Sequence, residues 1–105
     1  MASTKDELWE HCKSIADEVT EAYENGELFD YLNEYILDVE FIVSPPKSLR
    51  AVILGRTLGG PSIYIDTREH GVVGYWGGER AYTGLDYDLC NEIEQAFAEM
   101  YDYDY

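Results

Sequence analysis

The sequence predicts an α+β fold, a two-layer sandwich in which N- and C-terminal helices flank an antiparallel four-stranded meander. Apolar residues recur at helical spacing near both ends of the chain, while the middle alternates apolar and polar residues in short runs. The connections between these runs are shorter than the roughly dozen residues of a parallel crossover, so neighbouring strands should be antiparallel. We expect the order α(α)ββββα in one domain over residues 1–105.

The N-terminal segment has apolar residues four and three positions apart, which is the spacing of one helix face. These residues are Leu8, Cys12, Ile15 and Val19. Asn25–Gly26 should end the helix, because glycine readily adopts the left-handed conformation found at helix ends. A second, shorter helix is indicated by Leu28, Phe29, Leu32 and Ile36.

Four β-favouring runs follow, each ended by proline or glycine. The first begins at Leu37 and places Val39, Phe41 and Val43 on one face. The others cover residues 49–57, 62–67 and 72–76. Between the last two, Gly71 should occupy the dihedral angles that other residues avoid. Residues 80–83 allow a short fifth strand, which the four-stranded prediction does not include.

The C-terminal segment predicts another amphipathic helix, which Asp86 can cap. Its apolar side carries Leu89, Ile93 and Met100. Its acidic side carries Asp88, Glu92, Glu99 and Asp102. The apolar sides of both terminal helices need a partner, and one face of the meander offers it. Both acidic helix faces should therefore point to solvent.

The sequence contains no catalytic or ligand-binding motif, so we expect no enzyme activity, no cofactor and no metal. The potential metal ligands His11, Cys12, His70 and Cys90 are scattered rather than paired at short spacings. Two thiols in predicted helices are typical of reduced core residues. The absence of a secretion signal and of a long apolar segment favours a cytoplasmic protein without membrane contact.

Charge is the strongest functional indication in the sequence. The formal net charge is −15 at pH 7, and it is concentrated at the two ends of the chain. Residues 1–35 carry −8, residues 36–83 carry zero and residues 84–105 carry −7. Such a field repels phosphate, so we expect no direct binding of nucleic acid. Solubility alone would also account for acidity of this kind.

The acidic residues lie in rows, because helix positions three or four apart are neighbours in space. The partner-binding residues predicted on these rows are Asp17, Glu21, Glu24, Asp88, Glu92, Glu99 and Asp102. Such rows resemble duplex DNA, which carries one phosphate per roughly 1.7 Å of its axis. Because lysines and arginines that receive DNA would equally accept carboxylates, we expect a basic protein partner. The oligomeric state is left open by these patterns.

The predicted sheet offers a second candidate surface. By strict alternation, the residues facing the helices are Ile63, Ile65 and Trp76. The open face then carries Tyr64, Tyr75, Arg50, Val52 and Arg56. Tyrosine and arginine are enriched at protein interfaces, although such cross-strand neighbours can also simply shield one another. We therefore add Tyr64 and Tyr75 to the predicted partner-binding residues.

A small acidic chain with terminal helices around an antiparallel sheet resembles the inhibitors carried by phages and mobile elements. These include anti-CRISPR proteins, which block the DNA-recognition groove of a CRISPR nuclease, and anti-restriction DNA mimics. The segments Leu58–Arg68 and Gly71–Gly77 are also similar to small proteins of bacterial mobile elements. The resemblance implies a non-enzymatic inhibitor whose acidic helix faces mimic DNA phosphates and bind a CRISPR nuclease or a restriction enzyme.

Two other functions are compatible with the same residues. An immunity protein or antitoxin would neutralise a basic toxin through similar electrostatics, which favour fast association. A homo-oligomeric adaptor would instead use the open sheet face around Tyr64 and Tyr75.

Overall fold

The computed structural model describes residues 4–44 and 48–104, without the side chains of residues 4, 48–49 and 100–104. The helices in this part of the chain are α1 (Thr4–Glu24), α2 (Leu28–Tyr35) and α3 (Tyr87–Asp104). The strands are β1 (Asp38–Ser44), β2 (Ser48–Thr57), β3 (Ser62–Asp66), β4 (Gly71–Trp76) and β5 (Glu79–Gly84). The predicted α+β class is confirmed. The prediction of four strands is wrong, because these residues form five.

The fifth strand follows from a tight turn after β4. The described strands are antiparallel neighbours in chain order, from β1 at one edge of the sheet to β5 at the other. Trp76 pairs with Glu79 across Gly77 and Gly78, whose φ angles are 58° and 85°. Two consecutive residues with positive φ form the hairpin turn that matches the twist of the strands. The chain therefore reverses at once, and all of β5 pairs with β4. The proline-containing connection before β2 lies outside the described residues.

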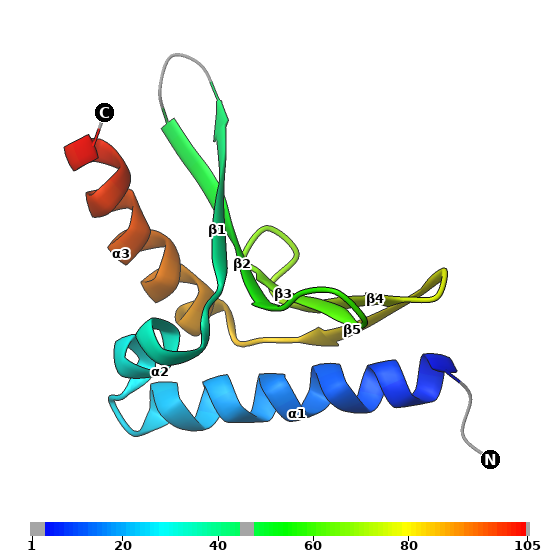
Figure 1. Cartoon of the computed structure of the whole chain (residues 1–105). Coiled ribbons are helices and arrows are strands. Elements are labelled where there is room, and N and C mark those ends of the chain that lie inside the picture. Colours follow the sequence, from blue (N-terminus) through cyan, green and yellow to red (C-terminus); the bar gives the residue numbers. More distant parts are fainter. Residues whose placement is uncertain (1–3, 45–47, 105) are drawn as a thin grey trace.

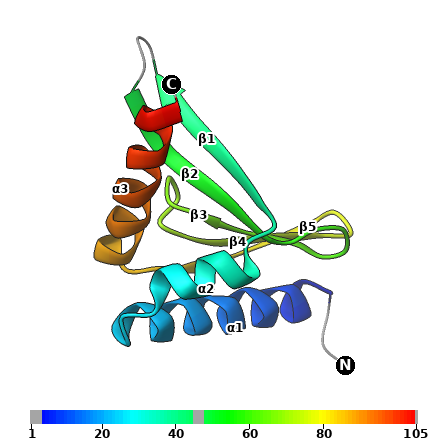
Figure 2. The same ribbon diagram turned by 60° about the vertical axis from the view of Figure 1, so that its left-hand side comes forward.

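The sheet is strongly bent, and its helices lie on the outer side of the bend (Figure 1). In that view β1 and β2 stand upright, while β4 and β5 lie across the picture. Helix α1 runs along β4 and β5, α3 runs beside β2, and α2 packs against α1. In the turned view, the inner side of the bend again carries none of the described helices (Figure 2). The sheet thus has one covered face and one open face.

The hydrophobic core lies between the helices and the covered face of the sheet. Ile63 and Ile65 are buried there, as predicted. Trp76 also faces α1, because its ring meets that of His11 edge-on with 6.4 Å between the centroids. Helix α1 approaches β4 closely at Gly74, where an added Cβ would lie 2.7 Å from Cys12 Sγ. Only glycine leaves room for this contact between helix and strand.

The turn before β4 differs from the sequence prediction. His70, rather than Gly71, has a positive φ, at 53°. Gly71 is needed for space instead, because the Tyr82 ring lies over it and a Cβ would come within 2.6 Å of the carbonyl oxygen of Thr83. The Tyr82 hydroxyl donates a hydrogen bond to the carbonyl oxygen of Glu69 at 2.8 Å. An aromatic side chain therefore covers the glycine and holds the turn.

Both cysteines are buried free thiols on helices, as the sequence predicts. Burial raises the pKa of the Cys12 thiol. Burial, followed by the negative charges of Glu94, Asp86 and Asp66, raises the pKa of Cys90 to about 12. Both side chains therefore stay protonated at neutral pH and act as small apolar core residues.

Gly74→Ala should destabilise the protein, because the added methyl group overlaps with Cys12 and Leu8 of α1. We expect the free energy of unfolding to fall by about 1–3 kcal/mol, the usual cost of overpacking a core. Gly84→Ala is the matched control, since its Cβ would meet nothing closer than the Tyr82 hydroxyl oxygen at 3.7 Å. Urea denaturation measures both variants. Equal stabilities would contradict the close packing of α1 on β4.

The raised pKa of Cys90 predicts a loss of stability in alkaline solution. The folded protein holds the thiol proton up to about pH 12, whereas an ordinary thiol releases it near 9.0. Between these values the folded state binds more protons, so raising the pH favours unfolding by about 1.4 kcal/mol per pH unit for this group. Urea denaturation of the wild type and Cys90→Ala from pH 8 to pH 11 tests this. The variant should show the shallower decline, and parallel curves would show that Cys90 makes no such contribution.

Candidate partner-binding surface

The acidic row on α1 lies on the side of the helix that faces away from the sheet. Asp17, Glu21 and Glu24 are all exposed. Asp17 is paired with Lys13 one turn earlier, with 3.0 Å between Nζ and Oδ1. Such an exposed pair contributes at most about 1 kcal/mol. The negative charge of this row is therefore greatest toward its C-terminal end.

The acidic row on α3 is also exposed where its side chains are described. Asp86 caps the helix, because its Oδ1 accepts a hydrogen bond from the backbone N–H of Asp88 at 3.1 Å. Asp88, Glu92 and Glu99 follow on the solvent side. The side chain of Asp102, which was predicted to continue the row, lies outside the described residues.

Tyr23 marks the place where the end of α1 lies near the beginning of α3. It directly precedes Glu24 on α1 and is partly buried against the core. Burial, and then the negative charges of Asp88, Glu92 and Asp86, raise the pKa of its hydroxyl. The carboxylates of the first two turns of α3 therefore lie close to the end of α1. We call Asp86, Asp88 and Glu92, together with the exposed Glu24 that follows Tyr23 in α1, the acidic corner.

The remaining predicted acids lie farther from the corner. Helix α1 continues beneath β4 and β5, whereas α3 rises beside β1 and β2, so the helices diverge from the point where they meet (Figure 1). Asp17 lies about two helical turns before Glu24 on α1, and Glu99 lies toward the C-terminal end of α3. The structure thus places Asp88 and Glu92 near the last turn of α1, which carries Glu24, and leaves Asp17 and Glu99 farther along their helices.

Arg56 is not on the open sheet face, in contrast to the prediction. The pairing of β2 with β3 passes from Gly55 directly to Thr57, so Arg56 is the extra residue of a bulge. Its Nε donates a hydrogen bond to the hydroxyl oxygen of Tyr31 on α2 at 3.1 Å. Its Nη2 lies 3.4 Å from Oε1 of Glu18 on α1. Arg56 therefore joins β2 to both N-terminal helices.

Two further contacts complete this junction. The Tyr31 hydroxyl donates a hydrogen bond to Oε1 of Glu18 at 3.1 Å, and Arg56 Cζ lies 4.6 Å from the ring centroid of Tyr35. Burial raises the pKa of the Tyr31 hydroxyl, and the hydrogen bond and charge of Arg56 oppose this effect. Arg56 thus compensates Glu18, which belongs to neither the acidic corner nor the predicted rows.

A second residue, Val52, also differs from its predicted position on the open face. Val52 is fully buried in the core, because it pairs with Phe41 on the covered side of the sheet. Arg50 is the unpaired residue where the pairing of β1 with β2 shifts, and its Nε donates a hydrogen bond to Ser44 Oγ at 2.8 Å. Alternation along one strand predicts which of its residues share a face. It does not predict the register between strands, which decides which face is turned toward the helices.

Tyrosines do gather on the open face, as predicted. Tyr64 and Tyr75 meet edge-on with 6.2 Å between ring centroids. Arg80 pairs across the sheet with Tyr75, and a hydrogen bond between their side chains raises the pKa of the guanidinium group. These residues lie on the face of the sheet opposite the helices. A partner that contacts the acidic corner would therefore not contact Tyr64 and Tyr75 through the same flat surface.

Among the described side chains of residues 5–44 and 50–99, no three His, Cys, Asp or Glu come together as metal ligands. None of the helices described for this chain combines the length and the apolar character that a bilayer crossing requires. Comparison of the chain with protein-family models gives no match. Comparisons with curated proteins and with solved structures give none either.

Arg56→Met should destabilise the protein, because it leaves Glu18 without its cation and removes the hydrogen bond to Tyr31. We expect a loss of about 2 kcal/mol in the free energy of unfolding. Arg50→Met, at an exposed position, should lower the free energy of unfolding by less than about 0.5 kcal/mol. Thermal and urea denaturation of the two variants would reveal the difference. If Arg56→Met leaves the free energy of unfolding unchanged, the junction of β2 with the helices contributes nothing to stability.

Proposed function

We propose that the protein is a non-enzymatic inhibitor that binds a basic nucleic-acid-handling protein, such as a CRISPR nuclease or a restriction enzyme. Its acidic helix faces would occupy the positions of DNA phosphates in the partner's groove. The observation that carries the proposal is the acidic corner, where the first carboxylates of α3 lie near Tyr23 in the last turn of α1, next to the exposed Glu24. Two separate charged segments thereby contribute to one surface.

The distribution of ion pairs supports this reading. Among the described side chains, the ion pairs join Lys13 to Asp17, Arg56 to Glu18 and Arg68 to Asp66. None of them involves Glu24, Asp88 or Glu92. Like charges held close together repel one another, and a cationic partner relieves this repulsion on binding. Guanidinium and ammonium groups that bind phosphate form charge-assisted hydrogen bonds to carboxylates as well.

The proposal predicts salt-sensitive competition with DNA. Fluorescent duplex DNA bound to each of a panel of purified CRISPR and restriction nucleases provides the assay. The protein should displace DNA from at least one nuclease, and its apparent affinity should fall as the NaCl concentration rises, because the contacts are ionic. Charge reversal by Glu24→Lys with Glu92→Lys should weaken this displacement by about 100-fold, given roughly 1–3 kcal/mol for each charged hydrogen bond.

The matched control carries the same change of net charge at a distance from the corner. Glu10→Lys with Glu79→Lys alters two exposed acids, one in the N-terminal half of α1 and one on β5. This variant should keep most of the affinity if binding depends on the corner. An equal loss in both variants would indicate that only net charge matters. Absence of displacement from every nuclease would contradict the proposed function.

A further inference from the structure

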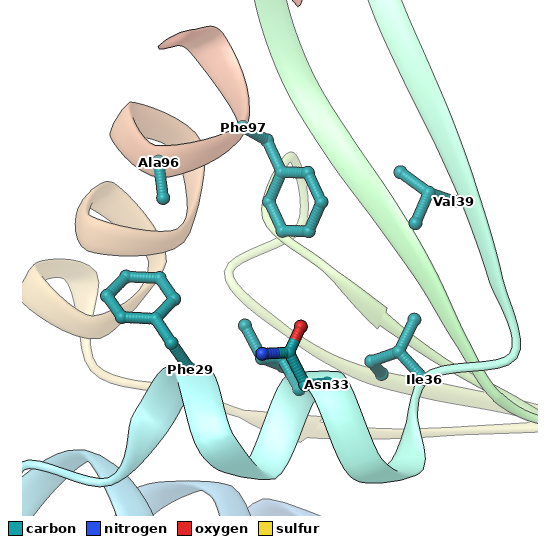
Figure 3. A pocket seen from close by; sticks show the side chains of 7 residues that line it. Phe29, Asn33, Ile36, Val39, Ala96 and Phe97 are labelled. Carbon is teal, nitrogen blue, oxygen red and sulfur yellow. The ribbon is translucent and has the colours of Figure 1, made fainter. Parts of the chain in front are cut away.

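An open apolar groove lies between α2, α3 and β1 (Figure 3). Phe29 lines it from α2, Ile36 from the position directly after α2, Val39 from β1, and Ala96 and Phe97 from α3. In the close-up, Phe29 points from α2 toward the turn of α3 that carries Ala96. The volume of the groove is about 280 Å³. This is slightly below the roughly 300–1,000 Å³ of pockets that enclose small molecules, and it suits apolar side chains of another chain.

The groove keeps its apolar side chains accessible rather than burying them. Phe29 is 44% exposed and Val39 is 38% exposed. Phe97 is partly buried and rests edge-on against Phe41, with 6.3 Å between the ring centroids. The floor of the groove is therefore anchored in the core, while its rim is open. A preformed apolar surface with a firm floor is typical of a docking site.

The charges around the groove have one sign. Glu92 and Glu99 lie four residues before and three residues after Ala96, so they flank it along the same side of α3. Asp30 is exposed on α2 next to Phe29. None of the residues that line the groove is basic. A suitable occupant must therefore combine apolar side chains with positive charge.

We propose that this groove binds a cationic amphipathic helix of the partner protein. One apolar side chain of that helix enters between Phe29 and Phe97, and its basic side chains reach Glu92 and Glu99. These two acids are seven residues apart on α3, a separation of about 10 Å along the axis. Basic residues at the same spacing on the docked helix would match them.

This inference rests on the proposed function, because the groove supplies an apolar anchor for the same basic partner. Glu92 of the acidic corner lies one helical turn before Ala96 of the groove, so one partner can engage both surfaces. Charge provides fast association, whereas an apolar anchor slows dissociation and selects among basic proteins. A second copy of this chain is a poor occupant, since each copy carries a net charge of −15 and would bring like charges to the acidic rim.

Synthetic peptides of equal length test the groove with the full chain. The probe is a fluorescently labelled amphipathic helix of leucine and lysine. The first comparison peptide replaces every leucine with serine, and the second replaces every lysine with glutamate. Fluorescence anisotropy should show that the leucine–lysine peptide binds at least about tenfold more tightly than the serine–lysine peptide, because it alone fills the groove. The leucine–glutamate peptide should not bind.

Two protein variants locate the binding. Phe29→Ser removes an exposed anchor, and Ala96→Trp fills the groove, so each should weaken binding of the leucine–lysine peptide by about tenfold or more. Trp9→Ser is the matched control, because Trp9 is 45% exposed, as Phe29 is at 44%, but lies in the N-terminal half of α1. It should leave the affinity unchanged. Circular dichroism confirms that each variant is folded before its affinity is interpreted.

The possible failures are distinguishable. Equal affinity for both lysine peptides would overturn the groove proposal and leave the charge-based function standing. Loss of DNA displacement by the Glu24 and Glu92 reversals without any effect of Phe29→Ser would have the same meaning. A dimer of the protein alone that Phe29→Ser dissociates, measured by analytical ultracentrifugation, would assign the groove to a second copy and overturn the proposal. Binding of the leucine–glutamate peptide as tightly as its lysine counterpart would also overturn it.

Discussion

The organisation of the molecule depends on one packing constraint, which is that α1 and α3 bury their apolar sides against the same face of the sheet. Gly74 allows α1 to contact β4 directly, and the bend of the sheet gives α3 its own place beside β2 (Figure 1). Because each helix can bury only one side, its carboxylates must face solvent. Helix α3 also begins near the end of α1, so its first acids lie close to Tyr23. Burial of apolar surface thus determines where the charge is gathered.

Periodicity in the sequence was sufficient for the helices and for most strands, because apolar spacing directly reflects which side of an element is buried. Alternation also placed Ile63 and Ile65 correctly on the covered face. It failed for Val52 and Arg56, since alternation orders residues within one strand and carries no information on how that strand is aligned with its neighbours. The bulge at Arg56 has no clear sequence mark. Gly77–Gly78 is a sequence signal for the turn that precedes the fifth strand, and the positive φ angles of these two residues close the hairpin.

The candidate site was predictable to a similar, partial extent. Exposed acidic rows follow from helix geometry, but their convergence depends on the relative placement of α1 and α3, which no local pattern encodes. Nothing in the sequence marks Tyr23 as the residue of α1 that lies near the first acids of α3. Likewise, the sequence placed Arg56 on the open face of the sheet. In the structure, Arg56 links β2 to α1 and α2 through its ion pair with Glu18 and its hydrogen bond to Tyr31. The groove involves α2, α3 and β1 together and was not visible in the sequence at all.

The separation of helices and open sheet between the two sides of the molecule has an electrical consequence. The segment from residue 36 to residue 83, which supplies nearly all of the sheet, is neutral overall, whereas the excess charge belongs to the helical ends of the chain. The centre of negative charge is therefore displaced from the centre of mass toward the helices. In the field of a cationic surface, this asymmetry exerts a torque that turns the helical side forward before contact. The molecule would thus reach such a surface with its helical side already facing it. A larger fraction of its collisions would then have this orientation.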